Sequence, residues 1–212
     1  FENYIAKGSF KNLEAEFFKD INVTKTNFDF FADKNDILIK NVFGEISEIK
    51  ISEGDIKLNL ENGLVLNSNF NSKFKINKNS LNNYKKYFKN YDLIKNLDEI
   101  QGNIKNSFFI NFDKTYKLKE YNYNLNGDIN KSKFIFTKPF KSKFFKEEIK
   151  EFYISNFKIK SIFSKENKQF TGFGEYSFNN LNFNKINIEQ SLKKNLLKLN
   201  LNFDYKNSLN LE

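Results

Sequence analysis

The sequence predicts a mainly all-β fold: an extended, twisted antiparallel meander folded over an apolar groove, with one helical segment near residues 80–98. Three observations predict it. Apolar and polar residues alternate with period two over most of the chain, which places successive side chains on opposite faces of a strand. The 27 phenylalanines and 10 tyrosines fall largely at the alternating positions. Short polar clusters separate these runs at the close spacing of a meander.

The first strands are alternating runs divided by polar turns. Their apolar residues include Leu13, Ala15, Phe17, Phe28 and Phe30. The polar cluster at residues 33–36 predicts a turn, because Asp and Asn side chains bond to nearby backbone N–H groups. Ile37 then opens a strand that Gly44 breaks, residues 46–51 resume it, and Glu53-Gly54-Asp55 predicts the next turn.

A long hairpin follows, in which the even-numbered residues of both arms are mostly apolar. Its apolar residues are Ile56, Leu58, Leu60, Leu64, Leu66, Phe70, Phe74 and Ile76. Asn62-Gly63 lies between the arms and predicts a type I′ turn, in which both central residues have positive φ. The return arm, residues 64–76, would reach roughly 40 Å at about 3.4 Å per residue.

The next segment has helical spacing instead. Its apolar residues are Leu81, Tyr84, Phe88, Tyr91, Ile94, Leu97 and Ile100. Asn79 or Ser80 could cap the first turn and Gly102 would end the helix. One helix, or two short ones, over about residues 80–98 should pack on the sheet or close one end of it.

Strands resume and run to the C-terminus. The first of them carry Ile104, Phe108, Ile110 and Phe112, then, after a turn at residues 113–115, Tyr121, Tyr123 and Leu125. The apolar parity changes by Phe134, which predicts a bulge or turn near residues 131–133. Pro139 marks a loop or an edge, since it cannot donate to a ladder. Asn179-Asn180 predicts a hairpin turn, and residues 197–205 a last strand.

Composition removes much familiar chemistry. The chain has no Cys and no His. This excludes serine–histidine and cysteine–histidine catalytic pairs and the usual His/Cys zinc sites. The net charge is +9, carried by lysine without arginine and interleaved with Asp and Glu. We interpret this as solvated strand faces rather than a nucleic-acid or membrane-surface patch, because arginine forms the bidentate contacts to bases.

The remaining candidates for chemistry have structural interpretations. In a strand or loop, the neighbours Glu147 and Glu148 point apart, which does not suit a pair of catalytic acids. Gly172-Phe173-Gly174 lacks the third glycine of a phosphate loop and fits a bend or bulge in a strand. The aromatic and lysine run at residues 84–89 fits core packing better than base stacking. We therefore expect no enzyme, no catalytic residue, no metal and no cofactor.

The apolar face of such a sheet needs a cover, and the sequence offers one helical segment for many strands. The sheet must curl on itself, pack on a second sheet or bind an apolar ligand. The residues expected to face a lipid in the groove are Ile56, Leu58, Leu60, Leu64, Leu66, Phe70, Phe74, Ile76, Phe108, Ile110, Phe112, Tyr121, Tyr123 and Leu125.

Two runs carry a family resemblance. Residues 28–44 (FDFFADKNDILIKNVFG) and residues 123–129 (YNLNGDI) have the form alternating strand, short polar turn, alternating strand, glycine. In this form the chain resembles the AsmA-like family of bacterial envelope proteins, with its TamB-like and YhdP-like members. The resemblance spans most of the chain and includes no catalytic motif. It implies a rod-like sheet with a continuous hydrophobic groove through which phospholipids pass to the outer membrane.

The resemblance also implies a place in the cell. It predicts a periplasmic protein of a Gram-negative bacterium, held at the inner membrane by an anchor outside these residues. Residues 1–212 would then be a single elongated β-rich segment of a longer protein, with a helical insertion at about 80–98. The expected partner is a phospholipid or another acyl-chain lipid, with no nucleic acid. The alternative is a structural or adhesive β-rich surface protein with a dry core and no ligand.

Overall fold

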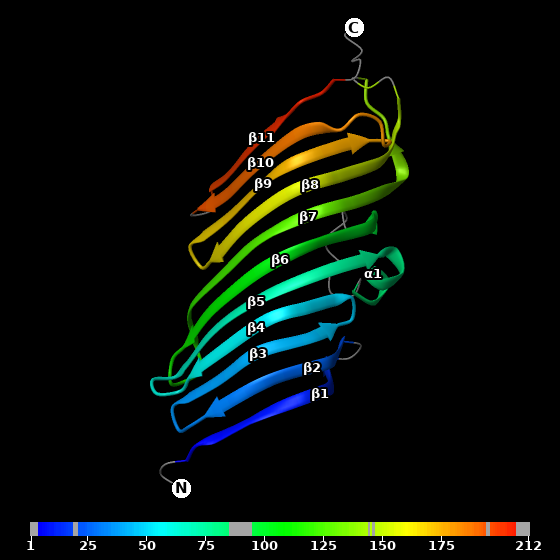
Figure 1. The fold of residues 1–212 in the computed structure, drawn as a ribbon. Coiled ribbons are helices and arrows are strands. Elements are labelled where there is room, and N and C mark those ends of the chain that lie inside the picture. The colour runs from blue at the N-terminus through cyan, green and yellow to red at the C-terminus, as the bar shows by residue number, and fades with distance from the viewer. Residues whose placement is uncertain are drawn as a thin grey trace.

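The computed structural model describes residues 4–18, 21–84, 95–143, 145, 147–193 and 196–206. Nearly all of them belong to one antiparallel sheet of eleven strands, in which each strand pairs with the next along the chain (Figure 1). The strands are β1 (Ala6–Phe18), β2 (Ile21–Ala32), β3 (Asp36–Ile46), β4 (Ile49–Asn59), β5 (Leu64–Asn77), β6 (Leu97–Phe112), β7 (Leu118–Phe140), β8 (Ile149–Ser164), β9 (Asn167–Phe178), β10 (Asn184–Lys193) and β11 (Leu196–Phe203). The predicted all-β meander is confirmed.

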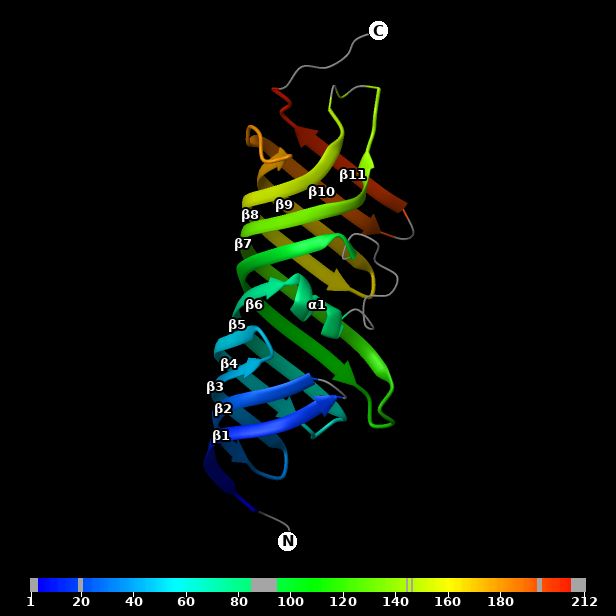
Figure 2. The same ribbon diagram turned by 90° about the vertical axis from the view of Figure 1, so that its right-hand side faces the viewer.

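The sheet is curved rather than flat. Figure 2 shows the strands bending at mid-length, so that the sheet is concave toward the right of that view. Register shifts accompany the bend in several strands, and Asn12, Lys25, Asn41 and Asn156 have positive φ there. An extra residue in one strand bends it and strengthens the local twist. The bend therefore has a local cause in the backbone.

The bulge predicted near residues 131–133 is one of these irregularities. Ile129 pairs with Gly102 and Lys131 pairs with Gln101, which leaves Asn130 as the extra residue. Because side chains alternate, this residue moves the apolar positions of β7 from odd to even numbers. β7 therefore continues through the bulge as a single strand.

The two faces of the sheet differ in chemistry. Directly opposed residues of antiparallel strands share a face, and the pairs Leu66 with Ile110 and Ile110 with Tyr121 define the apolar one. We call it the inner face, and the opposite one the outer face. Leu81 of the helix α1 (Lys78–Tyr84) packs on the inner face against Leu97 and Phe134, and α1 lies on the concave side in Figure 2.

The predicted helix differs from the observed one at both ends. α1 begins at Lys78, and the cap is Asn77, whose Oδ1 accepts the N–H groups of Asn79 and Ser80. Residues 85–94 of the prediction lie outside the described residues. Its last residues belong to β6, which begins at Leu97. The helical spacing there was misleading because a register shift after Leu97 and the inward position of Gly102 interrupt the alternation.

The turn at Asn62-Gly63 is not type I′. Gly63 has a φ of 113°, but Asn62 is absent from the positive-φ residues of the described chain. The connection spans residues 60–63, so Leu60 lies outside the strands and is exposed. A Cβ at Gly63 would lie 2.3 Å from the carbonyl oxygen of Phe112. Close contact with the neighbouring β6–β7 turn therefore requires glycine at position 63 of this loop.

Two glycines predicted at strand ends lie inside strands. Gly44 belongs to β3 and Gly54 to β4, and the turn between these strands is Ser47-Glu48. The predicted turn at residues 53–55 is therefore wrong. Both glycines occupy inner positions where a neighbour approaches closely: a Cβ would lie 2.7 Å from Thr26 Oγ1 at Gly44 and 2.4 Å from the Phe70 ring at Gly54. Close packing, rather than chain reversal, requires glycine here.

Other predicted turns are confirmed. Asp33 Oδ1 accepts the N–H groups of Asn35 and Asp36, each at 2.8 Å. Asp113 Oδ1 accepts the N–H groups of Thr115 and Lys117. The hairpin turn at residues 179–180 has positive φ at both asparagines, as a type I′ turn requires.

These turn carboxylates predict acid sensitivity. The hydroxyl of Thr115 and the N–H of Lys117 lower the pKa of Asp113 below its ordinary 3.8, and the N–H groups of Asp36 and Asn35 lower that of Asp33. A lowered pKa in the folded state stabilises the fold above the unfolded value and loses this contribution as the pH falls through the folded value. We expect the melting temperature to fall below about pH 4. Asp113→Asn should show a smaller loss between pH 7 and pH 3; identical pH profiles would contradict the prediction.

Candidate functional site

The inner face can be followed as rows of directly paired residues that cross the whole sheet. One row runs from β1 to β11 through all eleven strands. Its members are Gly8, Phe30, Ile39, Ile56, Ser68, Phe108, Tyr123, Phe163, Lys168, Leu192 and Leu197. The inner row therefore runs along the long direction of the sheet, across the strands, and is apolar except at Ser68 and Lys168.

The structure brings the predicted groove residues together, with one exception. Leu60 lies in the β4–β5 loop. The others share the inner face of β4 to β7: Ile56, Leu58, Leu64, Leu66, Phe70, Phe74, Ile76, Phe108, Ile110, Phe112, Tyr121, Tyr123 and Leu125. Most of these side chains are half-buried, and Phe108 is 36% exposed. The face is thus apolar and still open to contact.

Aromatic rings line both arms of the bent sheet. Toward the β8–β9 hairpin, the centroids of Phe108 and Tyr123 lie 4.5 Å apart and those of Tyr123 and Phe163 lie 6.0 Å apart. The other arm holds a larger cluster in which ring centroids lie 5.3–6.2 Å apart, as aromatic pairs prefer. It comprises Phe134, Phe145, Phe152, Tyr176, Phe178, Phe203 and Tyr205.

Sequence reasoning placed several of these aromatic residues in strands but not in the groove. Phe152 and Tyr176 lie on the same face as Phe134 only because the bulge at Asn130 and the register shift near Asn156 change the parity. In β7, the change of the apolar residues from odd to even numbers indicated the bulge. In β8, the spacing of Phe152, Ile154 and Phe157 indicated a similar change.

The bend is packed by rings laid over glycines. Phe157 is 4% exposed, and a Cβ at Gly172 would lie 2.5 Å from its ring. A Cβ at Gly174 would lie 2.5 Å from the Cα of Phe157. The absence of side chains at these glycines lets the phenylalanine lie flat on the neighbouring strand.

The inner face carries very little charge. Among the paired inner positions of the described strands, Lys168 is the one charged residue. Two tyrosine hydroxyls of the inner face form hydrogen bonds within the protein. Tyr123 Oη donates to Asn106 Oδ1, and Tyr176 Oη donates to the carbonyl oxygen of Asp204, each at 2.7 Å. Such a surface favours apolar groups over ions.

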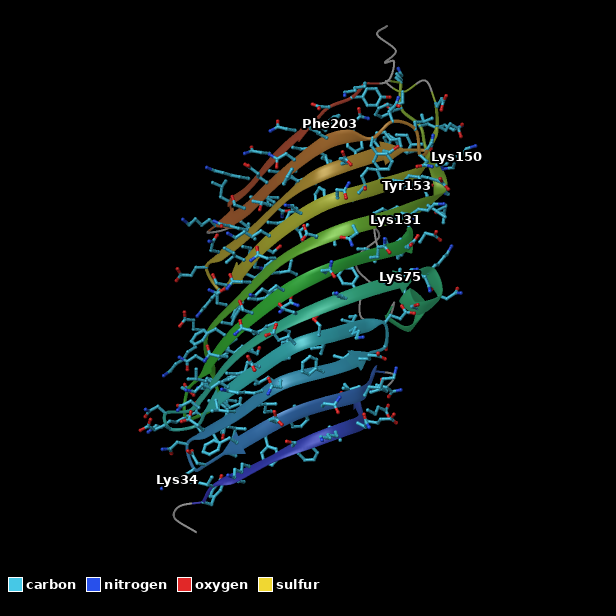
Figure 3. The ribbon with its side chains drawn as sticks, in the orientation of Figure 1. Lys34, Lys75, Lys131, Lys150, Tyr153 and Phe203 are labelled. Carbon is cyan, nitrogen blue, oxygen red and sulfur yellow. The ribbon has the colours of Figure 1, made fainter. Side chains whose placement is uncertain are left out.

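The outer face carries most of the lysines of the described strands. Figure 3 labels Lys34, Lys75, Lys131 and Lys150, which lie on different strands and turns along the sheet. Positive charge is therefore distributed along the molecule, as expected for solvated strand faces.

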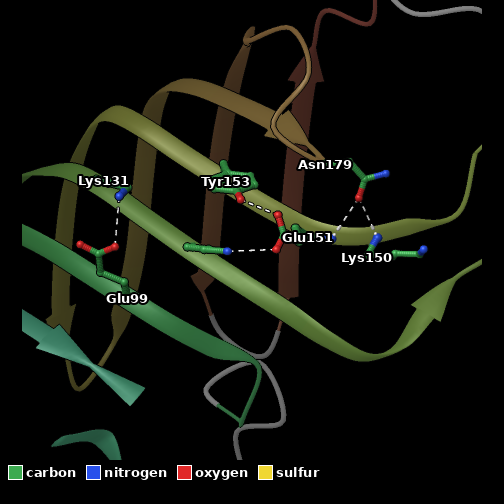
Figure 4. Close-up of polar contacts among 7 residues, drawn as sticks. Glu99, Lys131, Lys150, Glu151, Tyr153 and Asn179 are labelled. Atoms are coloured by element: carbon green, nitrogen blue, oxygen red, sulfur yellow. Dashed lines mark hydrogen bonds and ion pairs between the residues drawn. The ribbon is translucent and has the colours of Figure 1, made fainter. Parts of the chain in front are cut away.

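Several outer charges are paired. Lys131 Nζ lies 3.1 Å from Glu99, and Lys133 Nζ lies 2.9 Å from Glu151. Figure 4 labels Lys131, Glu99 and Glu151. Tyr153 Oη donates to Glu151 at 2.5 Å, and this bond and the one from Lys133 lower the pKa of Glu151. The carboxylate is therefore held in its ionised form and is poorly suited to donate a proton.

A hollow on the outer face was not anticipated. It has a volume of about 840 Å³, and its lining around Phe173 mixes polar residues with Ile159 and Ile186. Phe173 is 59% exposed and lies between Lys158 and Asn187. Its alternation with Gly172 and Gly174 places it on the polar face, so the sequence contained this signal.

The other sequence candidates have no catalytic arrangement. Glu148 pairs with Lys141 at 2.6 Å, and the hydrogen bond from Lys141 lowers the pKa of Glu148. Gly172 and Gly174 lie within β9, as expected for a bend in a strand. Most of the run at residues 84–89 lies outside the described residues. In the described part of the chain no group of Asp and Glu side chains could hold a metal ion, and no helix there has the length and apolarity to cross a membrane.

Comparison with known proteins does not assign the chain to a family. No family model, no curated protein and no solved structure matches it. The resemblance to AsmA-like proteins remains one of sequence pattern.

Proposed function

We propose that the inner face binds the acyl chains of phospholipids, and that the chain is a segment of a bacterial envelope protein of the AsmA-like kind that carries phospholipids between the inner and outer membranes. The observation that supports this most directly is the inner row that crosses all eleven strands and is apolar except at Ser68 and Lys168, with most of its large side chains only half-buried. A single-layered sheet leaves this face available to a ligand.

The energetics favour an acyl chain as the ligand. Holding a chain of about 16 carbons in water costs about 0.8 kcal/mol per methylene, roughly 12 kcal/mol in all. An apolar surface that contacts the acyl chain at successive strands would lower this cost as the lipid moves along the inner face. The half-buried leucines, isoleucines and phenylalanines would lose exposed apolar area at the same time.

Site-specific photocrosslinking tests the proposal. A photoreactive amino acid at Phe70 or Ile110, on the inner face, should capture phospholipid from vesicles, detected by mass spectrometry of the adduct. The same probe at the adjacent outer residues Asn69 or Asn111 should capture little. If inner and outer probes capture equally little, the proposal fails, and a structural or adhesive role without a ligand takes its place.

A charge on the path should block binding. Ile110→Lys would place an ammonium group among Leu66, Tyr121 and Phe108, where an unpaired charge is costly. We expect at least about tenfold weaker phospholipid binding, equivalent to about 1.4 kcal/mol. Asn111→Lys adds the same charge to the outer face and should leave binding within about twofold. Thermal melting of both variants separates lost binding from lost folding.

A further inference from the structure

We propose that Lys168 binds the phosphate of the lipid headgroup and thereby sets the position of the lipid on the inner face. The inference rests on the proposed function, because it assigns the headgroup contact of the same site. It starts from the placement of Lys168, the one charged residue among the paired inner positions of the described strands.

The register places Lys168 on the inner face. It is the second residue of β9 and pairs with Phe163 of β8 on one side and Leu192 of β10 on the other. Both partners belong to the inner row. A lysine in such a position can lay its methylenes along the apolar surface and keep its ammonium group in water.

An aromatic row leads from the centre of the sheet to this lysine. Phe108, Tyr123 and Phe163 are consecutive partners on β6, β7 and β8, with the ring spacings given above. At about 4.8 Å per strand, the row from Phe108 to Lys168 covers roughly 14 Å. An acyl chain lying on these rings would bring its headgroup end to the ammonium group.

The lysine is free to take an anionic partner. Its side chain is exposed, and within the described residues it forms no ion pair. A phosphate is the matching partner, because it offers several acceptor oxygens to the three donors of an ammonium group. The adjoining apolar row explains why the ligand should be an amphiphile rather than free phosphate.

The test compares two lipids that differ in the phosphate alone. Short-chain phosphatidic acid and diacylglycerol with the same acyl chains are titrated, below their micellar concentrations, into the purified protein at low salt. We expect phosphatidic acid to bind about threefold to fivefold more tightly, the size typical of a partly exposed ion pair. Added salt should reduce the preference. Lys168→Gln should abolish it, Lys168→Arg should retain it, and inorganic phosphate alone should not compete.

The controls separate this inference from the proposed function. Lys160→Gln removes a lysine from the outer face of β8 and should leave the preference unchanged. Equal binding of both lipids by the unmodified protein, or an equal loss of preference in Lys160→Gln, would overturn the role of Lys168 and leave acyl-chain binding intact. Binding of neither lipid would overturn the proposed function and this inference with it.

Discussion

Replacement of Phe157 by alanine should destabilise the sheet by about 3–5 kcal/mol, the usual cost of deleting a buried phenylalanine. Phe157 is 4% exposed, and its ring covers Gly172 at the bend of the strands. Truncation would leave a cavity there that the neighbouring backbone, held by ladders on both sides, cannot readily fill. Chemical denaturation measures the loss.

Phe173 supplies the matched control for Phe157. It lies on the adjacent strand, on the outer face, and is 59% exposed. Phe173→Ala should therefore change the free energy of unfolding by no more than about 0.5 kcal/mol. Equal effects of the two substitutions would mean that the ring of Phe157 does not hold the bend together.

Replacement of Gly63 by valine should cost about 2–4 kcal/mol. Two effects add here. The φ of 113° is one that a β-branched residue adopts only under strain, and a Cβ would approach the Phe112 carbonyl oxygen to 2.3 Å. The obstacle is backbone, so no side-chain rotation relieves it. Thermal melting and urea unfolding should both register the change.

The effect of Asn62→Val on stability distinguishes the observed loop from a type I′ turn. A type I′ turn would penalise valine at both central residues, whereas the observed loop has positive φ at Gly63 alone of the two. Asn62→Val should thus stay within about 0.5 kcal/mol of the unmodified protein, as an exposed loop substitution does. Comparable destabilisation by Asn62→Val and Gly63→Val would instead support a type I′ turn.

The local alternation predicted much of the fold correctly. From Leu64 to Ile76, every apolar residue except Val65 lies on the inner face, because the strand has no bulge in its pairing with β6. The polar turns at Asp33 and Asp113 could also be predicted, since their side chains bond to backbone N–H groups within four residues. These signals are local, and no distant contact is needed to interpret them.

The candidate site could be predicted in part. The groove residues of β5 and β6 were identifiable from parity, whereas the rings of Phe152 and Tyr176 were not assigned, because bulges change which parity faces inward. The position of Lys168 beside Phe163 and Leu192 is a consequence of register between strands. Nothing in the local sequence distinguishes it from the lysines of the outer face.

By itself, the sequence determined the class of the fold, the long strands and the apolar face, because alternation and polar turns act over a few residues. Only the tertiary structure decided where helix α1 ends and β6 begins, what Gly44, Gly54 and Gly63 accommodate, and which side chains share the inner face. Each of these depends on the approach of a neighbouring strand: the ring of Phe70 over Gly54, and the β6–β7 turn against Gly63. Such contacts join residues far apart in the chain, and their geometry exists only once the strands have paired.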